Sequence, residues 1–144
     1  MKLYASRPAL DALHSDLIAL GGFKGPLLSA LGREIDKHLG GLLTERMKKE
    51  KFAVKEGEVR LLDTHGRIPA DTVLLIGLGE DSQLKGESLR RAAAKAIRMG
   101  NKIRAKKISL EDIYTKKKNP APEERGQLFA EGALLGSYRF DRYK

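Results

Sequence analysis

The apolar positions of this chain change between two spacings along its length. Residues 72–78 are apolar at almost every position, which is typical of a central strand that is covered on both faces. Shorter apolar runs predict further strands at residues 1–5, 15–20, 58–63 and 107–110. The glycine pair Gly21-Gly22 is expected to end the strand at 15–20. The pattern therefore predicts a sheet built around one strongly buried strand.

Three other segments repeat their apolar residues every three or four positions, which is the period of a helix. In residues 27–42 the spacings are 3, 4, 4 and 3, and Pro26 is expected to start this helix because its first position needs no N–H. Gly40-Gly41 is expected to end or kink it. Residues 88–103 give the clearest helix, and residues 123–136 give the last one. Strands that alternate with helices predict an α/β fold with a mixed sheet.

The last predicted helix carries glycines at regular intervals, and we expect them to be points of close approach to a neighbouring element: Gly126, Gly132 and Gly136. Residues 116–122 form the only stretch with the composition of a linker. The 144 residues therefore predict a single domain of ordinary size.

Composition narrows the chemistry of the chain. It contains no cysteine, which excludes disulfides, thiolate metal sites and cysteine nucleophiles. The three histidines are 24 and 27 residues apart, so no pair has the spacing of a zinc site. No segment has the length of a membrane span or the pattern of a signal peptide, and we expect a cytoplasmic protein without membrane contact.

Positive charge is concentrated in one segment. The net charge is +9, and residues 85–107 hold nine basic residues and one acidic residue. Four of the basic residues follow one face of the predicted helix, at spacings of 4, 3 and 4: Arg91, Lys95, Arg98 and Lys102. The simpler interpretation is a solvated face opposite a packed alanine face. The alternative is a polyanion-binding stripe that contacts phosphates.

Three segments, taken in order, resemble a known family. They are Ala-Asp-Thr and an apolar strand ending in a glycine pair at residues 70–79, Leu-Arg-Arg-Ala-Ala-Ala at residues 89–94, and residues 130–144, which read AEGALLGSYRFDRYK. This ordered set resembles the N-terminal domain of the leucyl aminopeptidase family (cytosol aminopeptidase). The resemblance implies a macro-domain-like, three-layer α/β/α fold with a mixed central sheet.

The resemblance also implies which parts are missing. The family's catalytic part is a C-terminal domain where two divalent metals, manganese or zinc, activate a water against the peptide carbonyl. Its signature Asn-Thr-Asp-Ala-Glu-Gly-Arg-Leu is absent from this sequence. We therefore expect residues 1–144 to be a non-catalytic fragment of a cytosolic enzyme that removes N-terminal residues from peptides. Its expected partners are its own catalytic domain and neighbouring subunits of a homohexamer, and it carries no catalytic, metal or cofactor-binding residue.

Two alternative functions remain open. The basic segment 85–107 could form a DNA-binding module, because some bacterial members of the resembled family also bind DNA. A macro-like fold could instead bind a ligand of the ADP-ribose type. For that second alternative the loop at residues 21–26 offers backbone N–H groups before a predicted helix, with Lys24 as a candidate anion contact.

Overall fold

The sheet is built on two parallel strands that are apolar on both faces. In the computed structural model, which describes residues 14–25, 27–50, 56–113 and 121–142, β1 (Leu17–Phe23) is buried along its whole length. It pairs with β4 (Thr72–Gly77) from Leu17↔Thr72 to Gly22↔Gly77. The strand predicted at residues 72–78 is thus confirmed, and it lies in the interior of the sheet.

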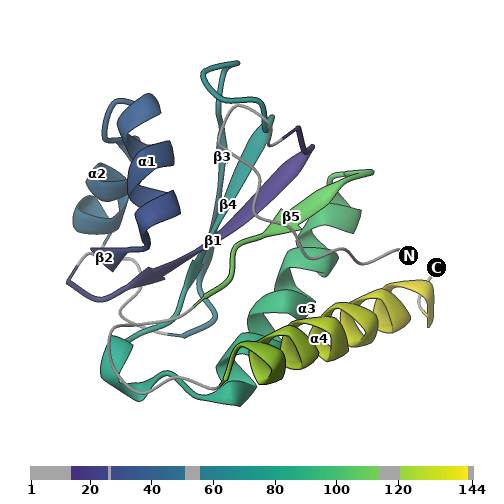
Figure 1. Ribbon diagram of the computed structural model, residues 1–144. Coiled ribbons are helices and arrows are strands. Elements are labelled where there is room, and N and C mark those ends of the chain that lie inside the picture. The colour runs from purple at the N-terminus through teal and green to yellow at the C-terminus, as the bar shows by residue number, and fades with distance from the viewer. Residues whose placement is uncertain (1–13, 26, 51–55, 114–120, 143–144) are drawn as a thin grey trace.

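The remaining strands make the sheet mixed (Figure 1). β3 (Val59–Asp63) pairs antiparallel with β4 and forms one edge. The other side of β1 is shared by two short strands: β5 (Ile108–Leu110) runs parallel to its first half, and β2 (Leu27–Leu28) runs antiparallel to its last residues. The strand order is β2-β1-β4-β3, with β5 beside β1.

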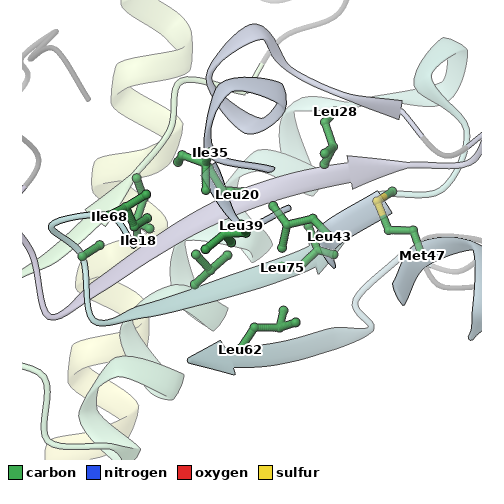
Figure 2. Packing of buried hydrophobic residues seen from close by; sticks show 12 residues of the cluster. Ile18, Leu20, Leu28, Ile35, Leu39, Leu43, Met47, Leu62, Ile68 and Leu75 are labelled. Carbon is green, nitrogen blue, oxygen red and sulfur yellow. The ribbon is translucent and has the colours of Figure 1, made fainter. Parts of the chain in front are cut away.

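Helices cover both faces, which gives the predicted three layers. α1 (Ala30–His38) and α2 (Leu42–Lys49) lie on one face, and α3 (Gly86–Lys102) and α4 (Pro122–Arg142) lie on the other (Figure 1). A short 3-10 helix, η2 (Asp81–Gln83), precedes α3. Side chains of β1 and β4 alternate between two separate cores, because neighbouring residues of a strand point to opposite faces. Figure 2 shows the core under α1 and α2, where Leu39 and Leu43 pack with Leu20 and Leu75 of the strands.

Two local predictions are wrong in the segment between β1 and α2. Gly21 and Gly22 continue β1 to Phe23 instead of ending it. A Cβ atom at Gly21 would lie 2.6 Å from Leu78 Cδ1, so this glycine serves close packing within the sheet. The helix begins at Ala30, well after Pro26, because the side chain of Ser29 caps it by accepting a hydrogen bond from Gly32 N at 2.9 Å.

Other boundaries agree with the sequence to within a few residues. The strands at 58–63 and 107–110 and the helix at 88–103 are confirmed as β3, β5 and α3. The last helix extends beyond residue 136 to Arg142. The predicted strand at residues 1–5 and the linker up to residue 120 lie outside the described residues.

Candidate functional site

A cavity lies between α3 and the end of the sheet where β4 finishes, next to the turn that precedes β3. Its volume is about 510 Å³. One wall is the carboxyl end of β4 with Ile76, Gly77 and Leu78, and a second wall is the turn at Glu56 and Gly57 that leads into β3. The third wall is the side of α3 from residue 87 to residue 98. The cavity therefore collects segments that are far apart in the sequence.

Three of the four predicted polyanion-binding residues line this cavity: Arg91, Lys95 and Arg98. Their spacing along α3 places them on one side of the helix, as the sequence indicates. Lys102, the fourth, is exposed in the last turn of α3 and is not part of the cavity wall. The basic stripe is therefore divided into a concave part and an exposed end.

Carboxylates hold two of the arginines beside the cavity. Arg91 Nη1 lies 3.7 Å from Glu56 Oε1, and its Nε lies 3.5 Å from Glu87 Oε1. Arg90 Nη2 lies 2.7 Å from Glu131 Oε2, which ties α3 to α4. The hydrogen bond with Glu131 raises the pKa of Arg90, and the same contact lowers the pKa of Glu131. These ion pairs are substantially exposed, so we expect them to fix side-chain positions more than to stabilise the fold.

Lys95 differs from these arginines. The residue is half-buried, and its side chain makes no hydrogen bond or ion pair with any residue in the described ranges. No carboxylate of the described residues forms an ion pair with its ammonium, so this positive charge is unpaired at the cavity wall. The site is therefore electropositive at this point.

The surroundings of Lys24 differ from those assumed for an anion-binding loop. Its Nζ lies 3.3 Å from Glu80 Oε1, and its backbone N–H donates to Gly79 O at 2.8 Å. The helix after the loop begins only at Ala30, with its own serine cap. Lys24 also lies outside the walls of the cavity. Its role as an anion contact stays a prediction, without the helix N-terminus that motivated it.

One buried carboxyl was missed by the sequence analysis. Glu111 fills the gap between β5 and β2 at the side of β1, where its Oε2 accepts a hydrogen bond from Gly21 N at 2.7 Å. Burial raises the pKa of this carboxyl to about 7, although hydrogen bonds from Ser29 and Gly21 act in the opposite direction. A glutamate directly after a short strand is usually exposed at the surface, so no pattern in the sequence indicates that Glu111 is buried.

Metal-binding side chains are not gathered anywhere in the part of the chain that the structure describes. No group of three or more histidine, cysteine, aspartate or glutamate residues there could hold a metal ion. His14, His38 and His65 are all exposed. The described donor set therefore does not fit a two-metal centre.

Among the helices of the described residues, none is sufficiently long and apolar to cross a bilayer.

Comparison with known proteins decides the family. A family model described as "Cytosol aminopeptidase family, N-terminal domain" matches residues 19–144. The chain belongs to this family. A probable cytosol aminopeptidase of Alkaliphilus oremlandii (strain OhILAs) is 35% identical over 145 residues, which cover 100% of this chain and 29% of that relative. The chain thus spans less than a third of the length of this curated relative, and the resemblance found in the sequence is confirmed.

Solved structures support the same fold. The bottromycin maturation enzyme BotP matches with a TM-score of 0.63 and 27% identity, covering 90% of this chain and 25% of its own. The macrodomain of Mycobacterium tuberculosis DarG matches with a TM-score of 0.71 and 10% identity, covering 90% of this chain and 88% of its own. At that identity the second likeness shows the fold alone. The macro-like α/β fold of this aminopeptidase-family domain is confirmed.

Proposed function

We propose that residues 1–144 form the single, non-catalytic N-terminal domain of a larger metal-dependent aminopeptidase. In that protein the domain would support assembly and limit access to the active sites, while the remainder removes N-terminal residues from peptides. The observation that carries the proposal is the match to the family's N-terminal domain over residues 19–144. The 29% share of the Alkaliphilus relative supports it, because a large part of such an enzyme lies outside the matched region.

We propose that the catalytic metals of such an enzyme bind in the part of the larger protein that lies outside residues 1–144. Two divalent ions, manganese or zinc, would supply the activation of water in a separate catalytic domain. The described residues of this chain do not fit such a centre. Relatives of this chain are named cytosol aminopeptidases, which supports a cytoplasmic location for the proposed enzyme.

The assembly role has a direct test. The larger protein, with and without residues 1–144, would be compared by analytical ultracentrifugation and by hydrolysis of a leucine anilide. We expect a homohexamer for the whole protein, and smaller species or altered peptide-length selectivity after removal of the domain. Unchanged mass, activity and selectivity would contradict the proposed role.

DNA binding is a second candidate, favoured by the position of four basic residues along one side of α3. Contacts with the phosphate backbone predict an affinity that falls steeply with salt. The test is a salt titration of duplex binding by the wild-type chain and by a double variant, Arg91→Ala plus Lys95→Ala. Weak binding that is insensitive to salt and to these substitutions would remove this candidate.

The ADP-ribose alternative also stays a prediction. The macrodomain likeness supports it at the level of the fold only. Calorimetry with ADP-ribose tests it directly, and the absence of heat at millimolar ligand would remove it.

A further inference from the structure

The cavity beside α3 has the size and position of a small-molecule site. Pockets that bind small ligands measure roughly 300–1,000 Å³, and the cavity measures about 510 Å³. In open α/β folds such sites lie beyond the carboxyl ends of the parallel strands. Ile76, Gly77 and Leu78 place this cavity at the carboxyl end of β4, which is parallel to β1.

Its walls combine an apolar surface with a net positive charge, because four basic side chains and two acidic ones, Glu56 and Glu87, line it. Ile76, Leu78, Ala92 and Ala94 contribute apolar atoms. Lys95 contributes an ammonium group without a partner among the described residues. This combination suits a ligand that has an apolar body and a strongly anionic group.

The other polar groups on the same side of α3 favour a phosphate as the anionic group of the ligand. Ser88 and Arg91 line the cavity together with Lys95, at helix spacings of 3 and 4. A hydroxyl donor, a guanidinium and an ammonium on one helix face match the several acceptor oxygens of a phosphate ester. We propose that this cavity binds a small phosphate ester with an apolar body, and that Lys95 neutralises its phosphate.

A nucleic-acid duplex fits these features less well. The phosphates along a duplex are contacted by side chains that protrude from a protein surface, rather than by the floor of a cavity. A duplex would therefore use the exposed Lys102 at least as much as the half-buried Lys95. Lys102 lies on the same helix but outside the cavity. A substitution of Lys102 therefore distinguishes duplex binding from the binding of a small ligand in the cavity.

The experiment uses phenyl phosphate as the probe and the ¹⁵N-labelled 144-residue chain as the receptor. We expect saturable chemical-shift changes at Gly77, Leu78 and the first turns of α3. Lys95→Gln should weaken binding about tenfold, the loss typical of one charged hydrogen bond. The matched control Lys102→Gln should change the affinity by less than about twofold, and thermal unfolding would establish that both variants are folded.

A third variant is expected to strengthen the binding of phenyl phosphate instead of weakening it. Glu56→Gln removes a carboxylate that competes for Arg91 at 3.7 Å, so we expect phenyl phosphate to bind about two- to threefold more tightly.

Four results would overturn the proposal, and none depends on the scaffold role proposed above. They are no saturable binding by the wild-type chain, equal losses for Lys95→Gln and Lys102→Gln, shift changes away from the cavity, and equal affinity for uncharged benzyl alcohol.

Discussion

Gly132 determines how closely α4 approaches α3. A Cβ atom at this position would lie 2.0 Å from the backbone oxygen of Arg90 and 2.9 Å from Ala93 Cβ. Because backbone atoms cannot move aside as a flexible side chain can, even one methyl group must separate the helices. The prediction of close approach is wrong for Gly126, because no atom of the described residues lies within 4 Å of a Cβ atom placed there.

This contrast predicts opposite effects for the same substitution on one helix. Gly132→Ala should lower the free energy of unfolding by at least about 2 kcal/mol through overpacking. Gly126→Ala should leave it unchanged or raise it by up to about 1 kcal/mol, because alanine favours the helix. Urea denaturation of both variants provides the measurement. Equal effects at the two positions would show that the two helices do not pack through Gly132.

Glu111 makes stability depend on pH. Its carboxyl holds a proton to about pH 7 in the folded chain, against an ordinary value of 4.5. Between these values the folded state binds more protons than the unfolded state, so stability falls as pH rises through this window and levels off above it. The full effect is about 3 kcal/mol.

Glu111→Gln should abolish this slope, because the amide oxygen still accepts from Gly21 N without titrating. We expect the variant to be more stable than the wild type by about 3 kcal/mol at pH 8 and similar to it at pH 4.5. Denaturation midpoints across this range provide the test. The exposed control Glu34→Gln should retain the wild-type slope, and a slope that survives in Glu111→Gln would exclude this carboxyl as its source.

Among the helices, α1 and α2 form a unit held by one carboxylate. α2 has Gly41 at its N-cap, so no side chain at that position can accept from the first turn. Asp36, buried in α1, accepts instead from Leu43 N at 2.7 Å and from Thr44 N at 3.3 Å. A residue of one helix thus satisfies the free N–H groups of the next.

Asp36→Ala should cost about 2–3 kcal/mol, because it leaves buried donors without an acceptor. Asp36→Asn should cost less, since its side-chain oxygen still accepts one hydrogen bond. Denaturation gives the energies, and faster amide exchange at Leu43 and Thr44 would locate the effect at the start of α2. Glu34→Ala, on the exposed side of α1, is the control and should stay within about 0.5 kcal/mol. A loss at Asp36 without faster exchange there would contradict the capping role.

The sequence predicted these elements unevenly, for physical reasons. Apolar periodicity identified β4 and α3 because burial alone determines their patterns. It missed α2, whose eight residues bury only Leu43 and Met47. The predicted end of β1 was too early because the glycine pair that starts at Gly21 usually interrupts a strand. In the folded sheet, Gly21 instead leaves space for the side chain of Leu78.

For the whole molecule, the order of three motifs in the sequence was sufficient to indicate the family and its fold. The basic residues of α3 were also evident from their spacing. Their grouping around a cavity was not, because its walls come from residues 56–57, 76–78 and 87–98, which only the folded sheet brings together. Glu111 was missed for the same reason, since its partner Gly21 is 90 residues away.

The proposed scaffold role requires that the catalytic groups of the enzyme lie outside this chain. The most direct measurement is hydrolysis of a leucine anilide by the purified 144-residue chain with added Mn²⁺ or Zn²⁺. We expect a rate equal to the metal-only background at every protein concentration. Saturable turnover that scales with the amount of chain and disappears with a chelator would contradict it.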